Sequence, residues 1–228
     1  MAMITSRIIE LWNTSGNELG GKVTMPADLH PAPGQYLLAR REGAMDPLPV
    51  PLFPAGLARS AMTVVPPLPD SWRVGDTLTL RGPFGKGFHL PRPARRVLLA
   101  DFGTRPQYLA PLIERALAQN ADLALFALQP PPGLPAAVEL IPPEALPDSA
   151  SWADYLAISL PLAQATDVRR LLRLPPGRRL PAGQVLVETD MPCGSSGECG
   201  VCALHTRRGW KLCCRDGPVF DLHLIEVV

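Results

Sequence analysis

The sequence predicts an α+β multidomain protein, in which an antiparallel β-barrel is followed by a small α/β domain with a parallel sheet and by a C-terminal cysteine segment. Short strand-like runs separated by glycine and proline fill residues 1–92. Longer apolar runs alternate with helical spacing over residues 93–183, and all five cysteines lie in residues 184–228. We take these three ranges as the expected parts of the chain. Apolar residues make up 46% of the 228, which is enough to build a core.

The expected barrel strands are short apolar runs bounded by glycine, proline or polar turns. Several short strands at such regular spacing are typical of an antiparallel barrel. The stretches that share these properties are residues 5–12, 22–29, 34–41, 60–68 and 76–83.

The character of the sequence changes near residue 93. Continuous apolar runs at residues 95–102, 122–128 and 154–160 are typical of parallel strands that are buried on both faces. A helix is predicted after the first of them, because Leu109, Leu112, Ile113 and Leu117 have helical spacing. Strand, helix and strand in this order indicate a parallel α/β layer.

Three further segments complete the second half of the chain. The spacing predicts a short helix over residues 165–174, with Thr166 or Asp167 as its N-cap. The proline-rich stretch 129–147 is expected to be a connection, and residues 184–190 a strand that leads into the cysteines.

Composition and charge exclude several classes of function. The formal net charge is +1, so nothing favours nucleic acid or an anionic membrane as a partner. The absence of any run of ~18 apolar residues predicts no transmembrane segment. Because the first residues also lack the pattern of a secretory signal, we expect a cytoplasmic protein. In a reducing compartment, a cluster of cysteines more often binds metal than forms disulfides.

The cysteine segment reads "MPCGSSGECGVC" at residues 191–202, and Cys213 and Cys214 follow. Cys193, Cys199 and Cys202 differ by one inserted residue from the plant-type Cys-x4-Cys-x2-Cys signature of a [2Fe–2S] cluster, whose fourth cysteine is distant. The interspersed glycines allow the tight turns that such a loop needs. Two alternatives remain: a zinc site, which usually has two Cys-x2-Cys pairs, and unligated buried cysteines.

The end of the chain, "CCRDGPVFDLHLI" at residues 213–225, together with "MPCGSSGECGVC", resembles the C-terminus of the electron-transfer subunit of class 1B dihydroorotate dehydrogenase. The resemblance implies a [2Fe–2S] cluster whose four ligands are Cys193, Cys199, Cys202 and Cys214. Cys213 then stands where that family has an apolar residue, and we expect it to pack in the core.

The resemblance extends more weakly upstream. "GDTLTLRGPFGKGF" at residues 75–88 is similar to the turn that closes the family's flavin barrel, and residues 30–40 and 95–106 match its barrel and nucleotide-domain strands. In that family the barrel holds FAD, the α/β layer admits NADH, and the cluster passes electrons to FMN on a separate catalytic subunit. The resemblance therefore implies a partner subunit that contains flavin.

The chain departs from the family at the nucleotide-binding elements. In residues 46–53 Val50 replaces the arginine that holds the FAD pyrophosphate, and Phe53 replaces the serine. No Gly-x-Gly-Thr element follows in residues 54–74, where Arg59 is expected to be an exposed loop residue. The glycine-rich loop is reduced to "DFGTR" at residues 101–105, in which Asp101 would repel a pyrophosphate. The family's later Cys-Gly-Pro loop reads Ser-Leu-Pro here. We therefore expect FAD and NADH binding to be weakened or lost.

The sequence leaves three functions open. The first is an electron-transfer subunit that carries a [2Fe–2S] cluster, the second a structural or assembly subunit that keeps the cluster for folding, and the third an intact FAD-dependent NADH-oxidising reductase subunit. No catalytic residue is predicted, because no nucleophile–base pair has a supporting context. His205 and His223 are not expected to be ligands, and Trp210 and Phe220 are expected to pack against the cysteine loop.

Overall fold

The computed structural model describes residues 3–14, 16–26, 29–44, 48–103, 105–131, 133–175, 177–178 and 180–225. Parts of four stretches discussed above lie outside the described residues, namely 27–28, 46–47, 104 and 132.

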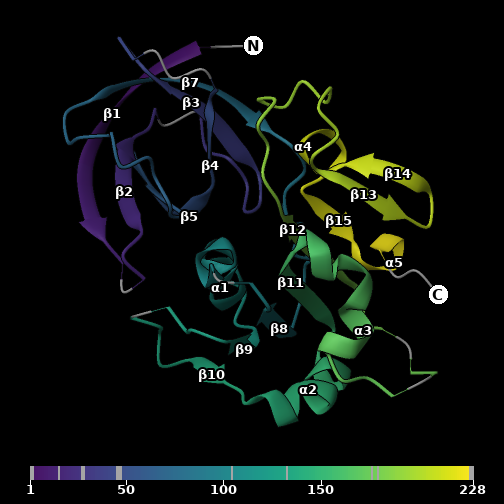
Figure 1. Ribbon diagram of the computed structural model, residues 1–228. Helices are drawn as coiled ribbons and strands as arrows, with labels where there is room; N and C mark the ends of the chain where they lie inside the picture. Colours follow the sequence, from purple (N-terminus) through teal and green to yellow (C-terminus); the bar gives the residue numbers. More distant parts are fainter. Residues whose placement is uncertain are drawn as a thin grey trace.

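The N-terminal part is an antiparallel sheet of seven strands that curls into a nearly closed barrel (Figure 1). Its strand order is β4-β3-β7-β1-β2-β6-β5. The strands are β1 (Met3–Asn13), β2 (Leu19–Thr24), β3 (Tyr36–Arg41), β4 (Val50–Leu52), β5 (Pro54–Ala58), β6 (Ala61–Val64) and β7 (Thr77–Phe84). Apolar residues alternate along β7, so Leu78 and Leu80 are fully buried and pack with Ile8 and Trp72 in the barrel core. The predicted barrel is confirmed.

The second sheet has six strands in the order β10-β9-β8-β11-β12-β15. All adjacent pairs are parallel except β12 with β15. The strands are β8 (Arg96–Asp101), β9 (Asp122–Ala127), β10 (Val138–Leu140), β11 (Tyr155–Pro161), β12 (Gly183–Glu188) and β15 (Val219–Asp221). Both faces of β8, β9 and β11 are buried, which explains their continuous apolar sequences.

The helix α1 lies between the barrel and this sheet (Figure 1). Leu112, Ile113 and Ala116 form its buried face. It ends where Asn120 adopts φ +56° and the Ala121 N–H donates to the Ala116 carbonyl, a termination that asparagine tolerates well.

All of the described helices, α1 included, are short. They are the α-helices α1 (Ala110–Leu117), α2 (Leu146–Trp152), α3 (Val168–Leu171), α4 (Cys213–Asp216) and α5 (Leu222–Ile225), and the 3₁₀ turns η1 (Pro106–Tyr108), η2 (Pro143–Ala145) and η3 (Leu162–Asp167). Asp167 is the N-cap of α3, but its side chain makes no capping hydrogen bond. The strand β10 and the start of α2 lie in the stretch predicted to be a plain connection. None of the described helices is long and apolar enough to cross a membrane.

The last part of the chain is built onto the second sheet. The strand β12 leaves the sheet into the cysteine loop, and the hairpin β13 (Ala203–Thr206) with β14 (Gly209–Leu212) follows. The chain then returns through β15 to pair with β12. In Figure 1 the cysteine loop therefore extends from the edge of the second sheet toward the barrel.

Candidate metal centre

The cysteine loop has an unusual backbone. Gly194, Ser195, Gly197 and Gly200 all have φ between +58° and +80°. Such left-handed residues turn the backbone N–H groups toward one side of a loop, and concavities of this kind bind anions and Fe–S clusters. Gly197 is also needed for space, because a Cβ there would lie 2.5 Å from the Cδ of Arg215.

The thiols of the four predicted ligands interact with one another. The Cys193 thiol interacts with Cys199, which lies on the same loop. The Cys214 thiol at the start of α4 interacts with Cys202, and also with Cys193. Four cysteine thiolates are the donor set that a [2Fe–2S] cluster requires. Within the described ranges, no three His, Cys, Asp or Glu side chains converge as a site for a single metal ion requires.

Backbone N–H groups point at two of these sulfurs. The Cys214 N–H donates to the Sγ of Cys202, with 3.4 Å between the two atoms. Burial acts to raise the pKa of the Cys193 thiol, but hydrogen bonds from Gly197, Ser196 and Cys199 outweigh it and lower the pKa to about 6. Burial and the neighbouring Cys202 instead raise the pKa of Cys214 to about 12. The loop thus already stabilises one thiolate, and metal binding would release the remaining thiol protons.

Cys213 is buried like its neighbour Cys214, but other cysteines act on its thiol through their charges, whereas the Cys214 thiol also hydrogen-bonds to Cys202 and Cys193. The Cys213 side chain is completely buried in the hydrophobic core, and its N–H donates to the Cys202 carbonyl at 3.0 Å. Burial, together with the nearby Cys202, raises the pKa of its thiol to about 12. Cys213 therefore packs as a small apolar residue, as predicted.

Tyr36 connects the barrel to the cysteine loop. Its hydroxyl donates to the Cys214 carbonyl at 2.9 Å and accepts a hydrogen bond from the Ser195 hydroxyl. Burial raises the pKa of Tyr36 to about 12, so this phenol remains a proton donor. A second link joins the Lys86 N–H to the Gly217 carbonyl at 2.5 Å. Sequence reasoning missed Tyr36, although it lies within the strand predicted over residues 34–41.

Some of the aromatic residues and histidines near the loop are buried and others are exposed. Phe220 is buried against Gly217, as expected for a residue that packs behind the loop. The expectation for Trp210 is wrong, because 71% of its surface is exposed on the hairpin and it contacts His205 edge-to-face. His205 and His223 are themselves exposed.

The space between the barrel and the second sheet is filled by aromatic rings. Phe53 is 7% exposed, and its ring centroid lies 5.1 Å from that of Tyr36 and 5.0 Å from that of Tyr108. Tyr36 and Phe53 belong to the same hydrophobic cluster as strands β8 and β11. Arg105 adds an ion pair across this junction, with 3.5 Å between its guanidinium and Glu18 of the barrel. Phe53 thus occupies the junction at the position where the resemblance would place a hydroxyl on FAD.

Three polar residues meet at the carboxyl ends of adjacent parallel strands. Asp101 ends β8, Ser159 lies opposite it on β11, and Glu188 ends β12. The Ser159 hydroxyl donates to Glu188 at 2.7 Å, and both carboxylate oxygens of the fully buried Asp101 lack a partner of good hydrogen-bond geometry. Burial, reinforced by the charge of Glu188, raises the pKa of Asp101 to about 7 despite weaker interactions with Gly103 and Ser159.

Gly103 is the one glycine left in the reduced loop, and Glu188 covers it. A Cβ at Gly103 would lie 2.0 Å from the Oε1 of Glu188. Burial also raises the pKa of Glu188. In open α/β sheets this edge is where nucleotides bind, with phosphate against the backbone of the first loop. Here a carboxylate takes the place beside that backbone.

Two pockets flank the cysteine loop. One of about 620 Å³ includes Cys193, Ser195, Arg81 and the half-buried Phe84 on the barrel side. The other, of about 500 Å³, lies between β4, η1 and residues 189–192, and Phe53 forms part of its wall. Val50 also lines this second pocket, whereas Arg59 is exposed in the turn between β5 and β6.

Comparison with solved structures identifies the class of fold. The chain is similar to an NADH-dependent reduced ferredoxin–NADP oxidoreductase described for flavin-based electron bifurcation, at 15% identity and a TM-score of 0.72, with 96% of this chain and 88% of that chain covered. It is also similar to the ferredoxin reductase of carbazole 1,9a-dioxygenase (14% identity, TM-score 0.61, 75% and 64% covered). A third similar structure is phthalate dioxygenase reductase (13% identity, TM-score 0.51, 82% and 68% covered). The protein therefore has a ferredoxin-reductase-like fold.

Comparison with protein families places the cysteine segment more narrowly. Residues 188–226 match the iron–sulfur cluster binding domain of dihydroorotate dehydrogenase B. This range begins at the end of β12 and includes the cysteine loop, the hairpin and α4. The resemblance recognised in the sequence is confirmed for this segment.

Proposed function

We propose that this protein is an electron-transfer subunit that carries a [2Fe–2S] cluster on Cys193, Cys199, Cys202 and Cys214. The observation that carries the proposal is that these four thiols interact with one another, Cys193 with Cys199 and Cys214 with both Cys202 and Cys193, around a loop with left-handed residues. The match of residues 188–226 to an iron–sulfur domain supports the same ligands. When bound, the cluster supplies one-electron redox chemistry, and the chain positions it and limits its contact with water.

Hydrogen bonds and burial set the redox environment of the proposed cluster. The N–H groups of Gly197 and Cys199 are directed at the sulfur of Cys193, and that of Cys214 at the sulfur of Cys202. Such bonds, together with solvent exposure, tune the potential of Fe–S clusters. Cys202 and Cys214 are buried whereas Cys199 is exposed. An electron would therefore leave most directly on the side of Cys199.

We further propose that FAD and NADH binding are weakened or lost. Two physical observations support this. The ring of Phe53 is packed between Tyr36 and Tyr108 in the junction that a flavin would need. Asp101 and Glu188 put two carboxyl groups at the sheet edge where a pyrophosphate would need backbone N–H donors.

A protein without its own electron donor works in a complex. We propose that a flavin-containing subunit delivers or accepts the electron, and that it docks near Cys199, where Val201 leaves 51% of its surface exposed. All five cysteines are free thiols in the structure, which is consistent with the reducing cytoplasm that the sequence favours.

A structural role is the second candidate, because the cysteine segment also ties the two halves of the molecule together. Tyr36 bonds to Ser195 and Cys214, and Lys86 bonds to Gly217. A cluster in this place would contribute folding energy even if it carried no electrons.

A redox titration of the anaerobically purified protein separates these functions. The electron-transfer proposal predicts that the cluster is reduced reversibly by one electron, at a potential in the range of cellular electron donors. EPR of the reduced form detects this reduction. A cluster that is reduced only irreversibly, with loss of iron, would support the structural role instead. Stoichiometric FAD that is reduced by NADH in the same sample would favour the intact reductase.

A further inference from the structure

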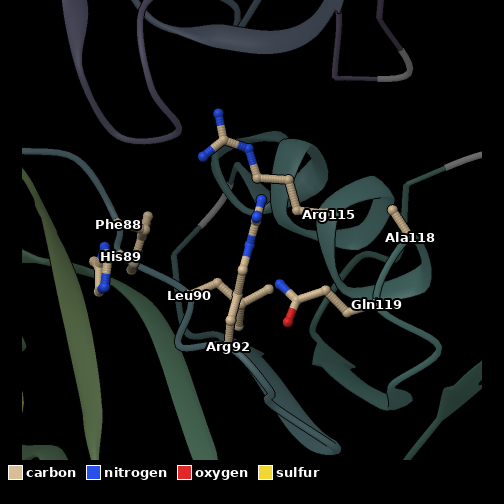
Figure 2. A pocket seen from close by; sticks show the side chains of 7 residues that line it. All are labelled: Phe88, His89, Leu90, Arg92, Arg115, Ala118 and Gln119. Atoms are coloured by element: carbon tan, nitrogen blue, oxygen red, sulfur yellow. The ribbon is translucent and has the colours of Figure 1, made fainter.

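A pocket far from the cysteine loop is lined by two arginines. It has a volume of about 750 Å³ and lies where the linker from the barrel meets the end of α1 (Figure 2). The linker contributes Phe88, His89, Leu90 and Arg92, and the end of α1 contributes Arg115, Ala118 and Gln119. This is the edge of the sheet where β8 begins, opposite the edge that carries Asp101 and Glu188.

The two arginines of this pocket lie close enough for their charges to interact. Figure 2 shows Arg92 rising from the linker toward the end of α1, which carries Arg115, and the charge of Arg92 acts on the Arg115 guanidinium. No carboxylate of the described residues forms an ion pair with either of them. The pKa of Arg115 is lowered by partial burial and by the charge of Arg92, which is the mark of an unrelieved like-charge contact.

The dipole of helix α1 explains the position of only one of the two arginines. Arg115 lies in the last turn of α1, where a cation interacts favourably with the helix dipole. Arg92 belongs to a different segment and gains nothing from that dipole. Because exposed arginines usually turn away from each other, two that converge on one pocket require a reason outside the helix.

The frame that holds the arginines together is rigid. The Gln184 side chain accepts hydrogen bonds from the His89 N–H at 2.6 Å and from the Tyr155 hydroxyl at 2.8 Å, which fixes the linker to the sheet. At the other end, the Oε1 of Gln119 accepts from the Ala94 N–H at 3.5 Å. The amide nitrogen of Gln119 therefore faces the pocket as a third donor (Figure 2). The site is formed in advance, which lowers the entropic cost of binding.

We propose that this pocket binds a small organic phosphate, with the phosphate held by Arg92 and Arg115 and the attached group lying toward Phe88, Leu90 and Ala118. Guanidinium groups match phosphate oxygens in geometry and form strong charge-assisted hydrogen bonds. The volume is within the usual range for small-molecule sites. The lining combines two guanidinium groups and the Gln119 amide with the apolar Phe88, Leu90 and Ala118, which favours a small phosphate ligand with an attached apolar group over an acidic protein segment.

The test measures binding of AMP, inorganic phosphate and adenosine to the full chain by calorimetry at low and at physiological salt. Variants R92Q and R115Q remove one guanidinium each, and R95Q, an exposed arginine of the same linker, is the matched control. We expect saturable one-to-one binding of AMP, weaker binding of phosphate and none of adenosine. Each pocket variant should weaken AMP binding by about tenfold or more, and R95Q should leave it unchanged.

Thermal unfolding provides an independent readout. Without ligand, R115Q should have a Tm close to that of the wild type, because relief of the like-charge contact offsets the lost interaction with the helix dipole. At a fixed concentration, AMP should raise the Tm of the wild type more than that of R115Q. The proposal is overturned if the wild type binds neither AMP nor phosphate, or if R92Q and R115Q bind AMP as well as the wild type does. It is also overturned if an acidic peptide displaces AMP from the pocket and binds more tightly, since the site would then be a protein-docking surface.

Discussion

Replacing Asp101 by asparagine should make the protein more stable at alkaline pH. The folded state raises the pKa of this buried carboxyl from 3.8 to about 7, because burial and Glu188 disfavour its ionised form. A carboxyl with a raised pKa favours the unfolded state increasingly as pH rises from the unfolded pKa to the folded one. A shift of about three units corresponds to a cost of about 4 kcal/mol above pH 7. Asparagine has the shape of the protonated acid and carries no such cost.

Part of this cost is already present at mildly acidic pH. With the same two pKa values, the wild type pays about 2 kcal/mol at pH 5.5 and about 4 kcal/mol at pH 8, so the advantage of D101N should grow by about 2 kcal/mol between them. In a protein of this size that corresponds to roughly 4–8 °C in Tm. Glu188, whose pKa is also raised by burial, acts in the same direction in the wild type.

The assay is anaerobic thermal unfolding of the wild type, D101N and D122N over this pH range. Asp122 is exposed at the start of β9 and controls for the loss of one charge. The difference between D101N and the wild type should widen steadily with pH, while D122N follows the wild type. If the difference is constant with pH, or if D101N is less stable at pH 8, the buried carboxyl is ionised and stabilised in a way that the geometry does not account for.

Three further substitutions test the cysteine segment and its junction with the barrel. Tyr36→Phe removes the hydrogen bond to the carbonyl of Cys214, so it should lower the free energy of unfolding by about 1–3 kcal/mol and speed the bleaching of the cluster by a chelator. The control is Tyr155→Phe, which removes a hydrogen-bonded phenol hydroxyl elsewhere in the protein and should leave the bleaching rate unchanged. Phe53→Ala should lower the free energy of unfolding by about 3–5 kcal/mol in denaturant titrations, because it leaves a cavity between two tyrosines, and a cost below 1 kcal/mol would mean that the ring does not pack there. Cys213→Ala should keep the full iron and sulfide content in chemical assays, because Cys213 packs in the core, and loss of iron would make it a ligand.

Most strands of the fold could be predicted from the hydrophobic pattern of the sequence, whereas the short strand β10 could not. Alternation along β7 and the continuous apolar runs of β8, β9 and β11 are visible in the sequence because each run is buried as a whole. The strand β10 could not be predicted from the sequence, because it is three residues long and only Val138 is buried. Its pairing with β9, rather than its own sequence, makes it a strand.

The candidate site was predictable only where a motif is local. The spacing of the cysteines and the resemblance of the tail predicted the ligand set from nearby residues. The substitution of Phe53 was equally visible, but its consequence depends on Tyr36 and Tyr108, which come from separate parts of the chain. The contact of Glu188 with Gly103 similarly depends on β11 lying between β8 and β12. The prediction for Trp210 was wrong because its aromatic character alone does not show whether the side chain covers the cysteine loop or is exposed.

The central proposal is that this fold keeps a [2Fe–2S] cluster while its binding of FAD is weakened or lost. The most direct test is an absorption spectrum of anaerobically purified protein, with iron, sulfide, zinc and released flavin assayed on the same sample. The account predicts a [2Fe–2S] spectrum with two irons and two sulfides per chain and no flavin. Stoichiometric FAD would contradict the role assigned to Phe53, and colourless protein with bound zinc would contradict the redox function itself.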